Sequence, residues 1–506
     1  MNKNYLLPAS DQVGRTSEGA SHRECASYEG APHEGALHFL KCDAPGKSLR
    51  RYPAYKDSGV PWLGDVPAHW DLHRAKFLFH YKKDSNTNGE QTNILSLTLR
   101  GVVNNDPNNP EGLVPKDYST YQKFNAGDLV FKLIDLENRQ TSRVGLVHED
   151  GIMSPAYVRL IPNTRTSIRY FYHQFFDLYL RGVFNQLGSG VRSTLGPNDL
   201  LDLRLSVPPP DEAEQIAAFL DAHDRQTRRY IHAQQRLIKL LTEQKQVLIQ
   251  QAVTRGLDHD VPLKDSGIPW LGKIPAHWET RRNSRIFSER NSPGREDLPI
   301  MIVSLNSGVT IGEEIDDNGR PRRLIEDRSN YKFAAKGDIA YNMMRMWQGA
   351  VGVVPTDGLV SPAYVVAHPL AGINSQYFEY LFRTGEYKNE VNRNSRGIVS
   401  DRNRLYWDGF KSLVSLVPPV EEQNSIVEHI TSESTKIDNA IERTHRQIVL
   451  VREYRTRLIA DVVTGKLDVR DVVLPDLEDD ESVDDLESIE TDEDNQDELG
   501  MQETDD

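Results

Sequence analysis

The chain has 506 residues, of which 38% are apolar, and this size and composition suit a protein with more than one hydrophobic core. Its two cysteines, Cys25 and Cys42, lack the spacing of a metal or redox site, which favours a reducing, cytoplasmic location. No apolar run approaches the roughly 20 residues that span a bilayer, so we expect no membrane partner.

The formal net charge of -15 comes from one end of the chain. Residues 471–506 contain 18 acidic residues and no Lys or Arg, which leaves 57 acidic against 60 basic residues elsewhere. We therefore expect residues 469–506 to form a disordered acidic tail, while the rest can carry basic surfaces for nucleic acid. At the other end, residues 1–50 contain three EGA triplets and are predicted to be a low-complexity extension.

A long internal repeat follows the extension. The phrase KDSGVPWLGDVPAHW at residues 56–70 returns as KDSGIPWLGKIPAHW at residues 264–278, with 12 of 15 positions identical. Four more pairs follow in the same order at offsets of 207 to 210: NAGDLVF and AKGDIAY, SPAYV twice, VPPPDEAEQ and VPPVEEQ, AVTRGLD and VVTGKLD. A period this long predicts duplicated domains rather than a solenoid.

Each copy divides into a globular part and a helix. Residues 51–210 and 259–419 alternate short apolar runs with Gly, Pro and Asn, which predicts one mixed α/β domain in each copy. Residues 211–258 and 420–468 begin after prolines and hold over forty residues without Gly or Pro, from about Glu212 to Thr254 and from about Glu421 to Thr464. This pattern predicts one long helix per copy.

The second helix has coiled-coil spacing. A stripe recurs there every seven positions, at Ile430, Ile437, Thr444, Val451 and Leu458. The stripe of the first helix is interrupted by His223, Thr227 and Gln244 and comprises Ile216, Leu220, Tyr230, Leu237, Leu241 and Leu248. Because one amphipathic helix cannot bury its stripe alone, we predict an antiparallel coiled coil with pseudo-twofold symmetry and one α/β domain at each end.

This order of parts resembles the specificity subunit of a Type I restriction-modification system. The similarity covers nearly all of residues 52–468 and is carried by the paired proline-to-EQ junctions, VPPPDEAEQ and VPPVEEQ, in a duplicated frame. The segment NMMRMWQGAVG at residues 342–352, followed by SPAYV, is also similar to a segment of target-recognition domains in this family. The N-terminal extension and the acidic tail fall outside the family pattern.

The resemblance implies a noncatalytic subunit that binds double-stranded DNA. Two tandem target-recognition domains would each read one half of a bipartite sequence, and the helices would set the unread spacer and dock two methyltransferase subunits. The complex would use S-adenosylmethionine for methylation, and ATP and Mg with motor and nuclease (restriction) subunits for cleavage. A decoy or regulatory homologue that inhibits such a complex remains an alternative.

Base-reading residues are predicted where the halves differ and where polar side chains collect in loops, because Arg, Lys, Asn and Gln match the base edges of the major groove. The candidates of the first half are Lys132, Asn138, Arg139, Gln140, Arg143 and Arg192. The candidates of the second half are Asn342, Arg345, Gln348, Arg393, Arg396, Arg402 and Arg404. Any single arginine is more often solvated or bound to phosphate than specific to a base, so the clusters are better candidates than their members.

Other conspicuous residues have a structural interpretation. The aromatic residues kept identical in both phrases are expected to brace the domains rather than stack on bases: Trp62, Trp70, Trp270 and Trp278, with His69 and His277. The basic run of the first helix either follows DNA phosphates or is an ordinary charged face; it comprises Arg225, Arg228, Arg229, Arg236 and Lys239.

Signatures of chemistry are missing from the sequence. We find no Gly-rich cofactor turn with an Asn/Asp-Pro-Pro-aromatic motif, no complete phosphate loop and no metal-ligand spacing, so no catalytic or metal residue is predicted. A modification enzyme with cryptic activity of its own is the rival that these absences count against.

Overall fold

A computed structural model describes most of one compact unit that spans Leu49–Asp506. The described residues are 50–98, 101–105, 118–134, 136, 142–163, 167–187, 194–268, 271–295, 297–312, 330–396 and 403–474. Residues 1–49 of the predicted N-terminal extension and residues 475–506 of the predicted acidic tail therefore lie outside the described residues.

Two long helices dominate the described chain. α6 (Pro210–Arg255) has 46 residues and α10 (Val420–Val463) has 44, so at 1.5 Å per residue α6 is about 69 Å long. Proline precedes both helices, and each has two acidic residues in its first turn, where the helix dipole favours negative charge. α6 ends at Gly256, whose φ of 78° lies in the left-handed region that glycine adopts at little cost.

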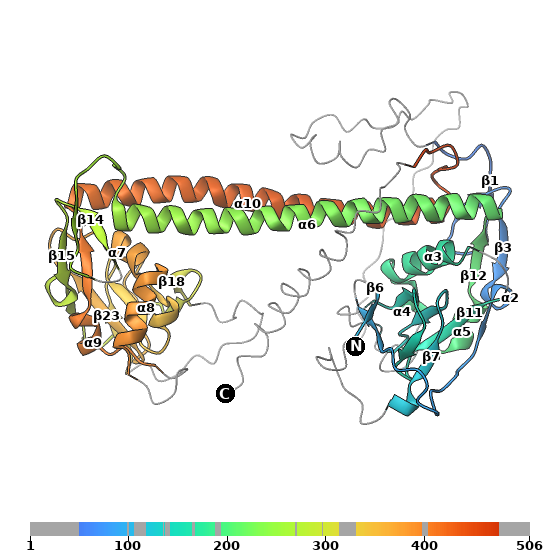
Figure 1. Ribbon diagram of the computed structural model, residues 1–506, viewed down its shortest axis with the longest axis horizontal. Coiled ribbons are helices and arrows are strands. Elements are labelled where there is room, and N and C mark those ends of the chain that lie inside the picture. Colours follow the sequence, from blue (N-terminus) through green and yellow to red (C-terminus); the bar gives the residue numbers. More distant parts are fainter. Residues whose placement is uncertain are drawn as a thin grey trace, which may run out of the picture. The chain divides into compact units, whose positions relative to one another are not determined.

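The helices pack side by side in opposite directions (Figure 1). Lys245 Nζ lies 2.7 Å from Asp438 Oδ1, and Arg455 pairs with Asp224, so residues late in α6 face residues early in α10 and the reverse. All five positions of the heptad series predicted for α10, from Ile430 to Leu458, are buried. The predicted antiparallel coiled coil is confirmed.

The stripe of α6 differs from its prediction. His223 and Thr227, expected as interruptions, are buried members of the seam, whereas Leu237 is 41% exposed. The seam residues of α6 are spaced by three and four positions, and the half-buried Ile238 belongs to this series. Leu237 lies one position before Ile238 and is therefore outside the seam. The first turns of α6 bury more surface than its middle because α3 (Ile168–Leu180) packs on them as well as α10.

The two α/β domains have matching four-stranded antiparallel sheets. In the first domain the strand order is β4 (Phe79–Tyr81), β11 (Val158–Pro162), β8 (Leu129–Phe131), β9 (Val144–Leu146). In the second it is β16 (Phe287–Glu289), β23 (Tyr364–Pro369), β20 (Ile339–Asn342), β21 (Val351–Val353). The predicted fold of mixed α/β domains in tandem, each followed by a long helix, is confirmed.

Smaller elements also correspond between the domains. Four two-stranded pairs in the first domain are β1 (Tyr55–Asp57) with β2 (Asp65–Pro67), β3 (Asp71–Arg74) with β12 (Arg204–Val207), β5 (Leu95–Thr98) with β6 (Gly101–Asn104), and β7 (Gln122–Phe124) with β10 (Gly151–Met153). Those in the second are β13 (Leu263–Asp265) with β14 (Lys273–Pro275), β15 (Glu279–Arg282) with β24 (Val414–Val417), β17 (Met301–Ser304) with β18 (Gly308–Ile311), and β19 (Lys332–Ala334) with β22 (Gly358–Val360).

Short helices complete each domain. Those of the first domain, besides α3, are α2 (Ala75–Leu78), η1 (Tyr118–Thr120), α4 (Val183–Leu187) and α5 (Pro197–Asp202). Those of the second are η2 (Asn283–Arg285), η3 (Met346–Gln348), α7 (Ser375–Phe382), α8 (Gly385–Asn394) and α9 (Trp407–Ser412).

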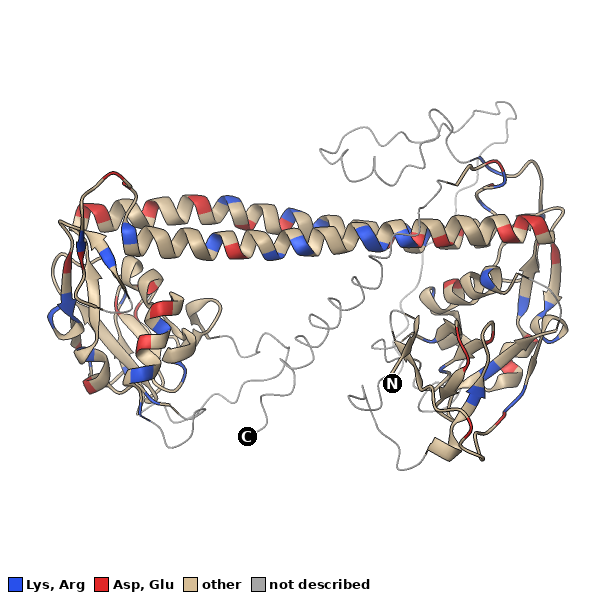
Figure 2. Cartoon of the chain, in the orientation of Figure 1, with Lys and Arg blue, Asp and Glu red and all other residues tan. Residues whose placement is uncertain are grey.

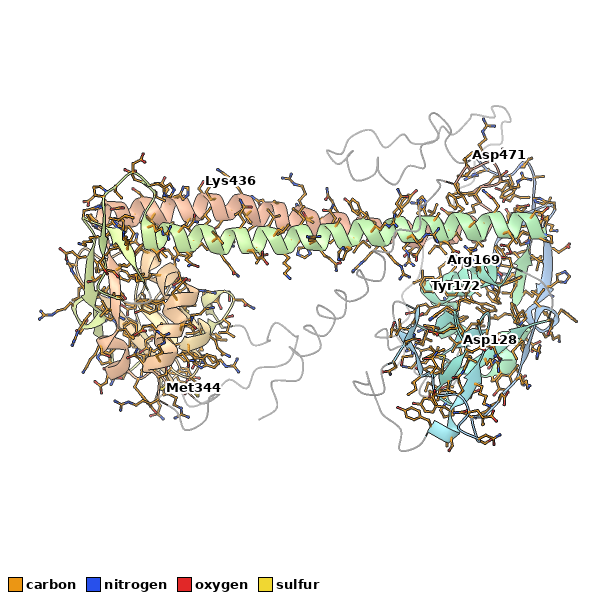
Figure 3. The ribbon with its side chains drawn as sticks, in the orientation of Figure 1. Asp128, Arg169, Tyr172, Met344, Lys436 and Asp471 are labelled. Atoms are coloured by element: carbon orange, nitrogen blue, oxygen red, sulfur yellow. The ribbon has the colours of Figure 1, made fainter. Side chains whose placement is uncertain are left out.

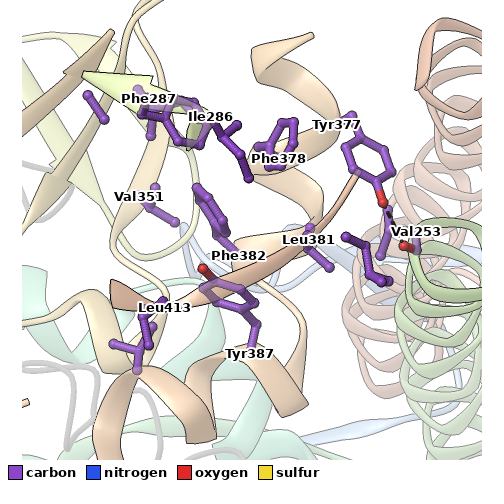
Figure 4. Close-up of a cluster of buried hydrophobic side chains, with 14 of the residues drawn as sticks. Val253, Ile286, Phe287, Val351, Tyr377, Phe378, Leu381, Phe382, Tyr387 and Leu413 are labelled. Atoms are coloured by element: carbon purple, nitrogen blue, oxygen red, sulfur yellow. Dashed lines mark hydrogen bonds between the residues drawn. The ribbon is translucent and has the colours of Figure 1, made fainter. Parts of the chain in front are cut away.

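The core of the second domain extends into the coiled coil (Figure 4). Phe287, Phe378 and Phe382 pack with Val253 of α6 and Ile430 of α10 in one buried cluster. This sharing of apolar surface fixes the domain on the helices.

One hydrogen bond recurs at both contacts between a domain and the helices. Tyr377 Oη donates to Val253 O at 2.9 Å, and the matching residue of the first domain, Tyr170, donates to Val463 O at 3.3 Å. Each domain is therefore seated on the end of one long helix by the same kind of contact.

Candidate nucleic-acid interface

The predicted reading segments begin at the tips of two equivalent β-hairpins. β8 and β9 form the hairpin of the first domain, and β20 and β21 form that of the second. At the ends of these strands, next to the tips, Lys132 N donates to Arg143 O at 3.1 Å, and Asn342 N donates to Ala350 O at 3.1 Å. The tip of the first hairpin is longer than that of the second by three residues, so the two halves differ where they are predicted to read.

The second reading segment of each domain reaches the same hairpin tip. In the second domain, Leu405 N donates to Met343 O at 2.8 Å. The first domain repeats this contact 210 positions earlier, where Leu195 N donates to Leu133 O at 3.0 Å. The structure thus brings together residues that lie 62 positions apart in the sequence, in both domains.

The second domain gathers its candidate residues into one basic surface. Arg345 precedes η3 and Gln348 is its last residue, and both are exposed. Arg393 lies exposed near the end of α8, which packs on η3. Arg396 and Arg404, also exposed, exchange two backbone hydrogen bonds of 3.0 Å. We call these five residues the second-domain basic surface. It presents four arginines from two segments, as contacts with phosphates and base edges require.

Asn342 and Arg402 differ from these five residues. Asn342 is half-buried, and its Oδ1 accepts a hydrogen bond from Met344 N at 3.0 Å, so its side chain shapes the hairpin tip. Arg402 lies outside the described residues.

The first domain is described less completely at its candidate residues. Asn138, Arg139, Gln140 and Arg192 lie outside the described residues. Lys132 is half-buried at the base of the tip. Arg143 is only 1% exposed, which places its side chain within the domain and argues against direct contact with a base. Composition could not distinguish this arginine from its neighbours, because its burial follows from the fold of the hairpin.

A buried carboxylate braces each hairpin at its start (Asp128 is labelled in Figure 3). Arg159 Nε donates to Asp128 Oδ2 at 2.6 Å, and Arg290 Nε donates to Asp338 Oδ2 at 2.5 Å. Burial raises the pKa of Asp128 above its ordinary value, although the Arg159 guanidinium opposes this shift. Removing one partner of a buried ion pair strongly destabilises a protein, because the other charge stays buried without a partner. These pairs therefore fix the hairpins in place.

The repeated aromatic residues brace the domains as predicted. Trp70 and Trp278 are fully buried, and Trp70 Nε1 donates to Glu212 Oε1 at 2.8 Å. His69 Nε2 lies 2.8 Å from Glu212 Oε2, and His277 repeats this contact 2.7 Å from Glu422. Both glutamates belong to the first turns of the long helices, so the duplicated phrase ties each domain to its own helix. Trp62 is half-buried in a small apolar cluster, and Trp270 lies outside the described residues.

The first domain meets the helices through charged groups. Asp221 of α6 accepts from Arg169 Nε at 2.5 Å and lies 2.7 Å from His173 Nε2. One turn further, Asp224 pairs with Arg228 and Arg455. Burial alone would raise the pKa of Asp224, but the two guanidinium groups hold it below its ordinary value. We call this group of charges the ionic joint.

The second domain meets the helices mainly through neutral groups. Asn374 N donates to Gln423 Oε1 at 2.9 Å, and Asn374 Nδ2 donates to Asn424 Oδ1 at 2.7 Å. Tyr380 Oη lies 3.5 Å from Thr431 Oγ1, at the positions that His173 and Asp221 occupy in the ionic joint. The two joints therefore have the same place in the repeat and different chemistry.

The basic run of α6 shares its helix with acidic groups. Figure 2 shows both Lys or Arg and Asp or Glu on each long helix, and on α6 most of the acidic residues lie in the first turns, before the basic run. Arg228 is paired with Asp224 at 3.0 Å, whereas Arg225, Arg236 and Lys239 are exposed. Residues 225–242 of α6 hold the five basic residues of this run and no Asp or Glu, so a path for phosphates and an ordinary charged face both stay open as interpretations.

Two other classes of site are missing from the described part of the chain. Among those residues, no group of three His, Cys, Asp or Glu side chains is placed to hold a metal ion. No helix among them is long and apolar enough to cross a membrane.

Comparison with known proteins points to one family, although no protein-family model matches the chain. The chain is 19% identical, over 439 residues, to a protein of Methanocaldococcus jannaschii that is named as the specificity subunit of the type I restriction enzyme MjaX. The match covers 81% of this chain and 96% of that protein.

The fold is also that of solved structures. A chain from a structure concerning complex assembly and conformational transition of the type I R-M system matches with a TM-score of 0.60 and 13% identity, covering 79% of this chain and 99% of that one. The HsdS subunit from Thermoanaerobacter tengcongensis matches at 14% identity with a TM-score of 0.47, over 79% of this chain and 98% of that one. The fold likeness rests on the first of these. The resemblance to Type I specificity subunits is therefore confirmed.

The ionic joint predicts a pH dependence of stability. Burial lowers the pKa of His173 to about 4, although the nearby Asp224 carboxylate favours the charged form. This pKa is below that of an exposed histidine, about 6.5. The contribution of neutral His173 to stability is therefore fully present above about pH 6.5 and is lost as the pH falls toward 4. We expect a loss of about 2 kcal/mol between pH 7 and pH 5, measured by urea unfolding.

A matched pair of variants isolates this effect. His173→Gln keeps a donor for Asp221 but cannot titrate, so it should flatten the pH dependence between pH 7 and pH 5. Thr431→Ala, at the neutral position that corresponds to Asp221 in the second domain, removes no group that titrates in this range and should leave the dependence unchanged. An unchanged slope in His173→Gln would contradict the assignment.

Proposed function

We propose that this chain is the DNA-recognition subunit of a Type I restriction-modification complex, in which it selects the site and catalyses neither methylation nor cleavage. One observation carries the proposal. Two equivalent hairpin tips, each met by a second loop segment, are held by domains seated at the two ends of one antiparallel helix pair. Two similar modules at a fixed separation suit two half-sites on a duplex, and their differences permit different half-site sequences.

The bipartite target follows from this arrangement. Each domain would read one half-site, the second of them through the second-domain basic surface. The coiled coil would set the unread spacer, since a rigid length of helix corresponds to a number of base pairs. The relative from Methanocaldococcus jannaschii, named as a specificity subunit, supports the same role for this chain.

The partners and cofactors follow from the same role. We propose that two methyltransferase subunits dock on the helix pair and use S-adenosylmethionine, and that restriction subunits add ATP- and Mg-dependent cleavage. Five apolar side chains of the helix pair are 41% to 55% exposed and support a docking surface: Leu237, Leu240, Val247, Val449 and Leu450.

Reconstitution tests the proposal directly. Purified chain and its methyltransferase partner are mixed with a DNA library, and methylated adenines are mapped by sequencing. We expect methylation at one gapped sequence only when both proteins are present. Activity of this chain alone would indicate an enzyme, and inhibition of an otherwise active complex would indicate a decoy.

The second-domain basic surface is tested by removing its arginines. Replacing Arg345, Arg396 and Arg404 together by Ala should weaken binding of the mapped site, because phosphate contacts release counterions. The slope of log affinity against log salt should become shallower by about 0.9 for each phosphate that the protein no longer neutralises. Arg281→Ala, which removes an exposed arginine paired with Glu279 on β15, is the control and should leave both quantities unchanged. An unaltered slope in the triple variant would exclude this surface.

The helix pair is tested as a ruler by lengthening both helices. One heptad is inserted near Gln234, midway between Asp224 and Lys245, and another near Gln447, midway between their partners Arg455 and Asp438. Matched insertions keep the seam in register and add about 10 Å, or about three base pairs at 3.4 Å each. Methylation mapping should show a longer gap between unchanged half-sites. Altered half-sites with the original gap would contradict the ruler.

A further inference from the structure

An exposed apolar residue lies at the same point of both hairpin tips. Ile134 is 41% exposed and Met344 is 40% exposed, and they are 210 positions apart, as are the strands that precede them. Single exposed apolar residues are common and carry little information. Ile134 and Met344, however, recur at equivalent points of two predicted reading surfaces whose other residues have diverged. Their shared exposure is therefore informative.

The backbone on each side of these residues is anchored. Leu133 and Leu136 are buried on either side of Ile134, and Met346 is buried beyond Met344. The carbonyls of Leu133 and Met343 each accept the cross-segment hydrogen bond described above. The chain thus turns one apolar side chain outward between residues that are fixed in the domain.

Both backbone polar groups of Met344 are hydrogen-bonded. Its N–H donates to Asn342 Oδ1 at 3.0 Å, and its carbonyl accepts from Trp347 Nε1 at 3.0 Å. Gly349 closes the turn with a φ of 107°, in the left-handed region. Figure 3 shows Met344 at the outer edge of the second domain. A side chain held in this way presents a defined apolar surface to a partner.

The surroundings of Met344 favour a nucleic acid as that partner. Arg345 follows it directly, and Arg396 and Arg404 lie on the segment whose neighbour Leu405 binds Met343. A methionine among exposed arginines suits a polyanion that also offers apolar groups. In the major groove of DNA that group is the C5-methyl of thymine, which proteins recognise by apolar contact.

We propose that Ile134 and Met344 are paired specificity-determining residues, each packing against the C5-methyl group of a thymine in its own half-site. This inference rests on the proposed function and assigns a direct contact to two residues outside the predicted set. Neither residue is in the predicted set, because that set contains only polar side chains. The signal available was the apolar match of Ile134 with Met344 inside otherwise diverged loops.

Uracil substitution tests this contact, because uracil differs from thymine only by the methyl group. The full chain with its methyltransferase partner is titrated with duplexes of the mapped site in which each thymine is replaced singly by uracil. We expect one sensitive thymine in each half-site, with binding weakened about three- to fivefold by loss of one buried methyl. Ile134→Ala should abolish the sensitivity in one half-site only, and Met344→Ala in the other only.

The two variants serve as controls for each other, and a third removes a matched residue elsewhere. Leu370 is also 41% exposed and follows the end of β23 opposite to the hairpin tip, so Leu370→Ala should keep both sensitivities. Half-sites without a sensitive thymine, or variants that keep wild-type sensitivity, would overturn the inference while selective methylation persists. Failure of the wild type to select any gapped sequence would refute the proposed function and, with it, this inference.

Discussion

The burial of one apolar seam between α6 and α10 is the interaction on which the rest of the structure depends. A single helix cannot bury its own apolar stripe, so α6 and α10 bury their stripes against each other. The contacts Lys245–Asp438 and Asp224–Arg455 show that the pair is antiparallel. The seam also continues into the domains, since Ile430 belongs to the coil and to the core of the second domain. A rigid link between domains and helices is the condition for any fixed distance between reading surfaces.

Duplication explains why the two halves share the same elements and seating contacts but differ in their hairpin tips and loops. The retained contacts are those that seat a domain: the histidine of the repeated phrase on a glutamate of the long helix, and the tyrosine on the end of the other helix. The diverged parts are the hairpin tips and the loops that meet them. Function is therefore expected where the repeat fails, and stability where it holds.

The sequence was sufficient for those features that depend on local periodicity or on the repeat. The heptads of α10 and the bracing role of Trp70 followed from spacing and from identity between the halves. Contacts between distant segments did not, because no periodicity links Arg169 to Asp221 or Asp224 to Arg455. The burial of Arg143 and the exposure of Ile134 depend on how each hairpin turns. Composition assigns such residues by type and does not predict which of them the fold buries or exposes.

The tyrosine contacts have an evolutionary consequence. Tyr170 and Tyr377 make the same bond to a main-chain carbonyl, a group that every residue of a helix end possesses. Mutation of the receiving side chain leaves that acceptor in place. A domain that keeps the tyrosine and its surrounding apolar face can thus be exchanged for another by recombination without redesign of the helix pair.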